Sequence, residues 1–433
     1  MNEIHDRLAA LGVRIPEILL PRNGVDLSKW AVIACDQFTQ DYGYWEQVKK
    51  AVLDAPSCLN LIFPELYLND SGAGTNAADA RARRIRDIHA SMVSYIREGV
   101  FAAPKRGCVY VERSTARHPR RRGLVISVDL EQYDWKPEST PLIRSTEGTV
   151  QERLPPRMEI RRGAVLETPH ILLLIDDEED RLIPSLGEIA RKRPPLYETP
   201  LMMSSGAVSG WALDTEEAWA VLASGLETLT GTSAARYGAS ASGERPFLFA
   251  VGDGNHSLAT AKAIWEEYKK AHSGEAGLEN HPARWALVEV ENLYDPGISF
   301  EPIHRVIFDV ELSEIMEILS GLENLKCLPD IAHNNVIRME NRSSAIATAS
   351  LQPLLDRFTE KKGCPIDYIH GDDEVIRLAT DTSRRAVGLL LPPVQKEGLF
   401  KTVAQTGPLP RKSFSMGDAW EKRFYLECRR LFS

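Results

Sequence analysis

Near the middle of the chain, an apolar run of strand length is followed by a glycine turn and then by apolar residues at helical spacing. Residues 247–251 read FLFAV, and Gly252-Asp253-Gly254 follows them, a combination typical of a tight turn. From Leu258 onward, apolar residues recur at steps of three and four, which is one face of a helix. The pattern predicts a strand, a turn and a helix whose mouth carries Asp253, Asn255, His256 and Ser257.

Two uses of that helix mouth are consistent with the residues. The first turn of a helix has N–H groups without intrahelical partners and a partial positive charge, so it suits an anion such as phosphate. Asn255 or Ser257 could instead accept hydrogen bonds from those N–H groups and cap the helix. The residues alone leave both alternatives open.

Periodicity and turn signals predict elements along the rest of the chain. Helices are expected over residues 44–53, 76–98, 214–229, 311–325, 351–361 and 418–431, with Asp214 or Thr215 capping the third. Strands are expected over residues 30–35, 107–111, 123–130, 170–176, 199–203, 207–213, 285–290 and 303–310, and a meander over 366–368, 374–379 and 386–391. Residues 59–68 are expected to be extended, and Pro155 and Pro156 exclude one continuous helix over residues 142–167. The irregular alternation predicts the α/β class (mixed α+β), with mixed sheets and flanking helices.

The length of the chain indicates more than one hydrophobic core. At 433 residues it exceeds the usual size of a single core, so two or three lobes are expected. Residues 231–243 are rich in Gly, Ala and Ser and are the best linker candidate. The predicted division is an N-terminal α/β lobe over residues 1–230, a linker or loop over 231–245, and a C-terminal α/β lobe over 246–433 that carries the glycine turn.

Charge and cysteine usage exclude several classes of protein. The net charge of −9 argues against nucleic acid as the main partner, because phosphate contacts need a basic surface. The six cysteines lack the spacing of a zinc site, which predicts free thiols in a reducing cytoplasm. The residues MNEIHDRLAALGVRIP lack the apolar region of a secretory signal, and no apolar run reaches the ~18–20 residues that span a bilayer. We therefore expect a cytoplasmic protein without a membrane partner.

The sequence lacks the common catalytic motifs, and the features that it does contain favour the binding of an anion. The chain has no GxxxxGK(S/T), GxGxxG, GxSxG or HExxH motif, and no metal site is expected. Residues 142–167 are rich in arginine, including Arg144, Arg153 and Arg157. A helix terminus gives an anion only ~0.3–2 kcal/mol, whereas catalysis of phosphoryl transfer takes ~8 kcal/mol or more. Cations from Arg, Lys or Mg²⁺ would therefore carry the developing charge, with Asp253 or His256 orienting the nucleophile.

Four blocks of the sequence, in order, resemble one known family. GDGNHSLATA resembles the ADGHHRYETA-like motif of the family called "domain of unknown function 1015". RSTEGTVQER is similar to that family's RHE-T-containing segment, and PIHRV to its PTHRV strand start. LPPVQKEGLFKTVAQTGPLPRKSFSMG resembles its closing LPPV…MPxKSTYF block, while CDQFTQDYGYWEQ stands where the family has an N-terminal YDV motif and departs from it. The resemblance covers nearly the whole chain.

The glycine turn is also similar to the phosphate-binding turn of the ParB/sulfiredoxin-like superfamily. That superfamily includes nucleotide-binding partition proteins, sulfiredoxins and a kinase that phosphorylates free serine. The resemblance implies a ParB/sulfiredoxin-like core around the turn and a phosphate cradled by Gly252, Asp253, Gly254, Asn255, His256 and Ser257. Asp253 and His256 remain the catalytic candidates that the chemistry of the turn suggests. The other blocks add the binding candidates Arg144, Glu147, Arg153, Arg157, His304, Arg305, Lys412 and Ser413.

Two positions of the turn depart from the family pattern. Asn255 stands in the place of the first histidine, and Ser257 stands in the place of the arginine. The second change removes a bidentate contact to phosphate. The resemblance supports the binding of a nucleotide or phosphate more directly than it supports catalysis.

The expected function follows from the turn, the arginines and the resemblance. We expect phosphoryl transfer on a small metabolite, with serine or phosphoserine as candidates and a small anionic or phosphorylated ligand as partner. ATP or ADP with Mg²⁺ would serve as cofactor, and no tightly bound cofactor is expected. The alternative is a non-catalytic nucleotide-binding regulatory protein. DNA partitioning is opposed by the acidic charge and by the absence of a helix-turn-helix pattern.

Overall fold

The chain folds into two compact units in a computed structural model that describes residues 2–68, 76–136, 138–149, 151–238, 245–343, 346–381 and 385–432. Unit 1 comprises residues 1–145, 149–298 and 419–433, and unit 2 comprises residues 146–148 and 299–418. These units do not follow the division at residues 231–245 that the sequence indicated. Residues 231–237 continue the helix α7 (Glu216–Tyr237), and residues 239–244 lie outside the described part of the chain. Both units combine helices with mixed sheets, which confirms the predicted mixed α+β class.

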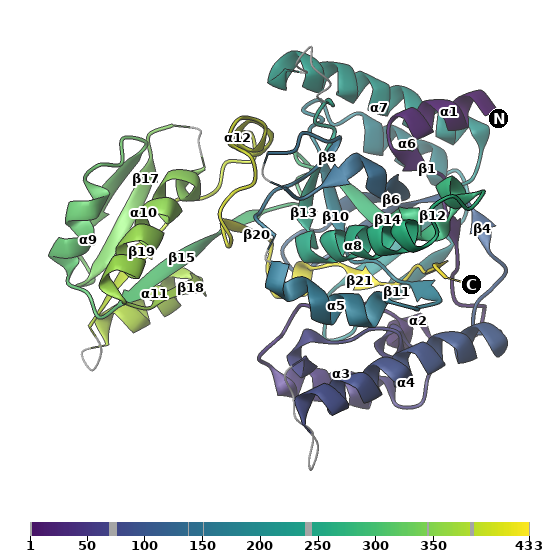
Figure 1. The fold of residues 1–433 in the computed structure, drawn as a ribbon, viewed down its shortest axis with the longest axis horizontal. Coiled ribbons are helices and arrows are strands. Elements are labelled where there is room, and N and C mark those ends of the chain that lie inside the picture. Colours follow the sequence, from purple (N-terminus) through teal and green to yellow (C-terminus); the bar gives the residue numbers. More distant parts are fainter. Residues whose placement is uncertain are drawn as a thin grey trace. The chain divides into compact units, whose positions relative to one another are not determined.

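A ten-stranded sheet forms the core of unit 1 (Figure 1). Its order is β11 (Tyr197–Pro200), β12 (Ala207–Leu213), β5 (Cys108–Ser114), β6 (Arg121–Asp129), β14 (Trp285–Asn292), β10 (Leu172–Ile175), β13 (Phe249–Asp253), β8 (Ile143–Ser145) and β7 (Tyr133–Asp134), and β1 (Val13–Arg14) pairs with β6. The pairs β10–β14, β13–β8 and β7–β8 are parallel, and the other pairs are antiparallel. Strands β10 and β14 are buried along their whole length, as strands covered on both faces must be.

Helices and short strand pairs surround this sheet. The helices are α1 (Asn2–Ala10), α2 (Leu27–Trp30), α3 (Tyr42–Val52), α4 (Ala77–Arg97), α5 (Leu154–Arg161), α6 (Leu182–Ala190), α7 and α8 (Asn255–Ala271), and β2 (Glu17–Ile18) pairs with β4 (Lys105–Arg106). Helices α5 and α8 pack against each other, as do α6 and α7. Helix α5 begins at its prolines, where the missing N–H costs no intrahelical bond. Thr215, one of the two predicted caps of α7, accepts a backbone N–H at the start of that helix, and Asn76 does the same at the start of α4.

Two predictions in unit 1 were wrong. Residues 59–68 are not extended, because single 3₁₀ turns occupy 58–60 and 65–67. Residues 418–431 do not form a helix: β21 (Phe424–Tyr425) pairs with β3 (Val32–Ile33), and β22 (Arg429–Arg430) pairs with β9 (Leu166–Glu167). Arg423, Glu427 and Arg429 are buried here and form ion pairs with carboxylates or arginines of unit 1. These tertiary contacts override the local helical spacing.

Unit 2 is built on a six-stranded sheet. Its order is β16 (Leu325–Pro329), β17 (Val336–Asn341), β19 (Ala386–Leu390), β15 (Phe300–Phe308) and β18 (Ile366–His370), and β20 (Phe414–Met416) pairs with β15. Its helices are α9 (Leu312–Leu319), α10 (Ala347–Lys362), α11 (Asp372–Thr380) and α12 (Gly398–Thr406). The predicted strand over residues 374–379 is wrong, because these residues belong to α11. Val375 and Ala379, four positions apart, both pack over Gly388 of β19, so the apolar spacing there is helical. Within the described ranges, each helix is too short or too polar to cross a bilayer.

Candidate functional site

The glycine turn is tighter than the sequence indicated. Strand β13 continues through Gly252 and Asp253, and helix α8 begins at Asn255, so Gly254 alone connects them. Gly254 has φ of 80°, and a Cβ there would meet the Cα of Ile171 at 3.1 Å. Left-handed backbone and close approach both require glycine at this position.

The first turn of α8 is not capped by its own side chains. The Asn255 Oδ1 accepts a hydrogen bond from the Ser145 hydroxyl at 2.7 Å. The Ser257 Oγ lies 3.0 Å from the His170 Nε2. The N-cap residue itself is Gly254, which has no side chain. Capping by Asn255 or Ser257 was therefore a wrong alternative: Asn255 interacts with Ser145 of β8, and Ser257 interacts with His170, which precedes β10.

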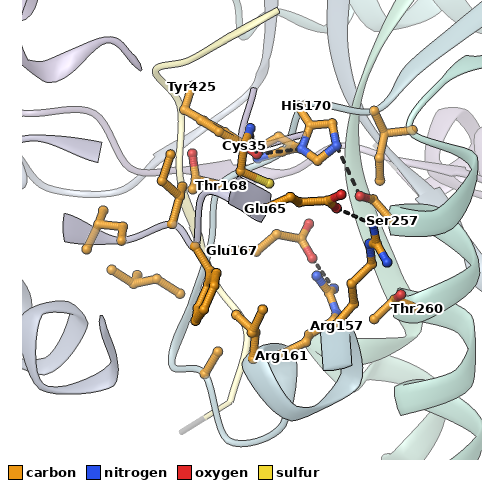
Figure 2. A pocket seen from close by; sticks show the side chains of 18 of the residues that line it. Cys35, Glu65, Arg157, Arg161, Glu167, Thr168, His170, Ser257, Thr260 and Tyr425 are labelled. Carbon is orange, nitrogen blue, oxygen red and sulfur yellow. Dashed lines mark hydrogen bonds and ion pairs between the residues drawn. The ribbon is translucent and has the colours of Figure 1, made fainter. Parts of the chain in front are cut away.

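His170 reaches this turn because of the pairing of two strands. Strand β10 runs antiparallel to β13, with Leu172 opposite Asp253, so the residues that precede β10 lie beside the start of α8. The buried His170 ring lies between Ser257 and Tyr425, whose hydroxyl is 2.6 Å from the His170 Nδ1 (Figure 2). The Asp36 Oδ2 lies 3.7 Å from the His170 Nε2. A histidine is thus held at the helix start by a serine, a tyrosine and a carboxylate.

Lys422 brings a cation to the same turn. The pairing of β3 with β21 places Asp36 and Lys422, each just outside these strands, on the same side of unit 1. The Lys422 Nζ lies 3.2 Å from the Asp253 Oδ2, and the lysine side chain is only 8% exposed. Burial alone would raise the pKa of Asp36, but the charge of His170, a hydrogen bond from Gln37 and the charge of Lys422 hold that pKa below its ordinary value. Asp36 is therefore a carboxylate at neutral pH.

A cavity of about 150 Å³ opens beside the first turn of α8 (Figure 2). It is lined by Cys35, Leu61, Ile62, Phe63, Glu65, Leu68, Met92, Arg157, Ile160, Arg161, Ala164, Leu166, Glu167, Thr168, Pro169, His170, Ile171, Ser257, Thr260 and Tyr425. Burial raises the pKa of the Cys35 thiol, so that thiol stays protonated at neutral pH. Burial also raises the pKa of Glu65, although its ion-pair partner Arg157 opposes that shift.

The three predicted arginines of unit 1 have different surroundings. Arg157 lines the cavity and forms an ion pair with Glu65. Arg144 donates to the carbonyls of Pro141 and Arg245 and lies over the Phe247 ring, near the beginning of β13 rather than at its end. Arg153 is exposed, and its carbonyl accepts a hydrogen bond from Arg157. Of these three, Arg157 alone lines the cavity. His256 is half-buried at the second position of α8.

The remaining predicted residues, Glu147, His304, Arg305, Lys412 and Ser413, belong to unit 2. The His304 Nδ1 accepts the backbone N–H of Leu391, and its Nε2 lies 3.0 Å from the Asp372 carboxylate. Arg305 is fully buried, donates to Gln352 at 2.8 Å and stacks over the Tyr368 ring.

Ser413 and its neighbours also make contacts within unit 2. Ser413 is buried, receives a hydrogen bond from the Thr348 hydroxyl and donates its backbone N–H to Glu147. The cavity at Ser413 measures about 10 Å³, which holds at most one water molecule. Lys412 is exposed. The role of these five residues as phosphate ligands stays a prediction.

Four residues of the site were missed at the level of sequence: Asp36, His170, Lys422 and Tyr425. Asp36 lies in the segment that stands where the family has its YDV motif, so it carried a signal. His170 is a polar residue at the start of the strand predicted over residues 170–176, which is a weaker signal. No signal in the sequence indicated Lys422 or Tyr425, because the apolar spacing of their segment predicted a helix.

The side chains that surround the turn include few groups that could bind a metal ion. Among the described residues, no group of three or more His, Cys, Asp and Glu side chains is placed to hold a metal ion. A Mg²⁺ ion that arrives with a nucleotide needs only one or two carboxylates beside the phosphate oxygens. Asp253 and Asp36 are carboxylates of the site, and both interact with Lys422.

The family of the chain is defined by its match to a family model. The chain matches the model described as "Protein of unknown function (DUF1015)" over residues 19–386. This protein therefore belongs to the DUF1015 family, as the four sequence blocks predicted. No curated protein matches the chain.

Solved structures give only distant likenesses. A free serine kinase in complex with ADP is 11% identical, with a TM-score of 0.35 over 70% of this chain and 91% of that chain. A conserved hypothetical protein from Pyrococcus furiosus is 10% identical, with a TM-score of 0.32 over 70% and 94% of the two chains. SbnI from Staphylococcus aureus is 10% identical, with a TM-score of 0.32 over 71% and 83%. These scores are too low to support an argument.

Proposed function

We propose that this protein binds a phosphate group at the N-terminal end of α8 and transfers a phosphoryl group from ATP or ADP to a small hydroxyl-bearing metabolite. One observation carries the proposal: the first turn of α8, whose own side chains do not cap it, adjoins Lys422 and the Asp36–His170 pair. The start of a helix and a lysine favour an anion. A carboxylate beside a histidine favours the handling of a proton. The similarity of the turn to ParB/sulfiredoxin-like phosphate-binding turns supports the same function.

The residues of the site have different roles in the proposed reaction. The N–H groups of the α8 start and Lys422 bind the transferred phosphoryl group, and Mg²⁺ on the nucleotide would neutralise further phosphate charge. Asp36 accepts a hydrogen bond from the acceptor hydroxyl and so orients it. The acceptor oxygen forms a bond to phosphorus while the bond from phosphorus to the leaving-group oxygen breaks. The acceptor proton passes to Asp36, and His170 holds that carboxylate in place.

Transfer can be tested with purified protein, ATP or ADP, Mg²⁺ and a panel of acceptors that includes serine. Phosphorylated product is detected by ³¹P NMR and mass spectrometry. Lys422→Ala should weaken nucleotide binding about tenfold to a hundredfold, the range for a lost charge-assisted contact. Asp36→Asn should lower turnover by about 10²–10⁴. Lys326→Ala, an exposed lysine of unit 2 paired with Glu340, is the control. Unchanged nucleotide affinity in Lys422→Ala would disprove the proposal.

A second candidate is a nucleotide-binding regulatory protein without catalysis. Asn255 and Ser257 favour it, because they replace the histidine and arginine of related turns and are engaged with Ser145 and His170. This candidate also predicts loss of nucleotide affinity in Lys422→Ala. It differs in predicting no phosphorylated product from any acceptor, while a bound nucleotide is recovered intact.

A further inference from the structure

The cavity beside α8 has an apolar part and a polar part. Leu61, Ile62, Phe63, Met92, Ile160 and Leu166 supply apolar side chains. The hydroxyls of Ser257, Thr260 and Tyr425, the His170 ring and the Cys35 thiol supply polar groups (Figure 2). A ligand that fills this cavity needs an apolar body and a hydrogen-bonding group.

The charged side chains of the cavity are already paired with each other. Arg157 forms an ion pair with Glu65, and Arg161 forms one with Glu167. Glu167 also accepts a hydrogen bond from the Leu287 N–H at 2.6 Å and lies 3.1 Å from the Arg429 Nε. A charged or zwitterionic ligand would lose its hydration and would have to compete with these pairs. The charges therefore favour a neutral ligand.

The size of the cavity sets the size of the ligand. A cavity of about 150 Å³ with apolar walls accommodates a ring of the size of benzene, about six carbon atoms. Because Ser257 lies in the first turn of α8 and lines the cavity, a ligand hydroxyl at this end meets the same turn that the phosphate would occupy.

We infer that this cavity binds the phosphoryl acceptor, and that the acceptor is a neutral alcohol with a compact apolar body of about six carbon atoms. The inference rests on the proposed function and assigns its acceptor class. The ligand hydroxyl lies at the His170–Ser257 end, beside the histidine whose Nε2 is 3.7 Å from the Asp36 Oδ2, and the apolar body contacts Met92 and Ile160. Its hydroxyl oxygen forms the new bond to phosphorus and its proton goes to Asp36, as in the reaction above.

Direct binding of benzyl alcohol to the full-length protein, measured by calorimetry without nucleotide, tests this inference. Saturable binding is expected for the unmodified chain. Met92→Trp fills the cavity and should weaken that binding roughly tenfold or more. Val93→Trp is the matched control, because Val93 is the next residue of α4 and is 49% exposed, whereas Met92 is buried. Ile160→Phe is a smaller filling change that serves if Met92→Trp does not fold.

L-serine and inorganic phosphate separate the outcomes. No binding of benzyl alcohol, equal binding to Met92→Trp and Val93→Trp, or L-serine binding in this cavity instead would each overturn the inference. In each of those cases the proposed function would still stand if the unmodified chain binds phosphate and Lys422→Ala binds it more weakly. Benzyl alcohol bound as expected, with no phosphate or nucleotide bound, would leave the cavity's ligand class standing and would remove the proposed phosphoryl transfer.

Discussion

At the scale of single residues, the site depends on buried charges that are paired across long sequence distances. Glu167 is 6% exposed and interacts with Arg161 and Arg429 and with the Leu287 N–H. Burial by itself would raise its pKa, but the two arginines and the hydrogen bonds lower it to about 2. Such a carboxylate stabilises the folded chain only while it is ionised.

Glu167→Gln should therefore destabilise unit 1, and the effect should depend on pH. The folded pKa lies below the ordinary value, so the stabilisation is fully present above about pH 5 and is lost as the pH falls toward 2. At pH 7 the expected loss is about 3 kcal/mol. All eight tryptophans lie in unit 1, so urea unfolding followed by tryptophan fluorescence measures this unit alone.

The control for this measurement is Glu159→Gln. Glu159 pairs with Arg81 on the surface, where its side chain is 45% exposed, and its loss should cost less than about 1 kcal/mol. The difference between the Glu167→Gln variant and the unmodified chain should shrink between pH 5 and pH 3. A difference that stays constant over this range would show that the pairing of Glu167 is not electrostatic.

At the scale of elements, the connection between β13 and α8 determines the site. Antiparallel β10 brings His170 to the end of β13, and parallel β8 brings Ser145 to the same end. Gly254 makes the reversal with a left-handed backbone conformation and packs closely against Ile171. The same connection serves both as a structural link and as the proposed phosphate site.

Gly254→Ala should weaken phosphate binding as well as stability. The left-handed φ costs an alanine about 1–2 kcal/mol, and its Cβ would also press on the Ile171 backbone. Gly277→Ala is a matched control, because Gly277 is a left-handed N-cap glycine of the same unit with nothing within 4 Å of a new Cβ. Calorimetry with inorganic phosphate should show weaker binding in Gly254→Ala only. Equal phosphate affinity in the two variants would count against binding at α8.

At the scale of the whole molecule, the chain leaves unit 1 after residue 298 and returns to it at residue 419. The returning segment adds β21 and β22, the cation Lys422 and the buried residues Arg423, Glu427 and Arg429. The site in unit 1 therefore needs residues that are synthesised after the whole of unit 2.

Deletion of residues 419–433 should unfold unit 1 and leave unit 2 folded. The deletion leaves buried partners such as Glu167 and Glu289 without their arginines, and each such loss costs about 3–5 kcal/mol. Hydrogen exchange followed by mass spectrometry should show lost protection in β6, β10 and β14 and retained protection in β15 and β19. Arg430→Ala, which changes an exposed residue of the same segment, should leave both units protected.

The sequence predicted the parts of the site that depend on local order. The strand and helix around Gly252–Ser257, the helix at residues 76–98 and the mixed α+β class followed from periodicity, glycine and capping residues. The predictions from apolar spacing were wrong at residues 374–379 and 418–431, where short apolar segments are compatible with both a helix and a strand. In those segments the packing of Val375 on Gly388 and the buried arginines decided the outcome.

By itself, the sequence determined the family and the glycine turn, because both can be identified from short motifs of contiguous residues. Only the tertiary structure decided which side chains reach that turn. Asp36, His170 and Lys422 are far apart in sequence and meet through the pairings of β3 with β21 and of β10 with β13. Strand partners are chosen by burial and by long-range hydrogen bonds, which no local spacing encodes. For that reason the glycine turn was visible in the sequence, whereas the lysine, the histidine and the cavity that lie beside it were not.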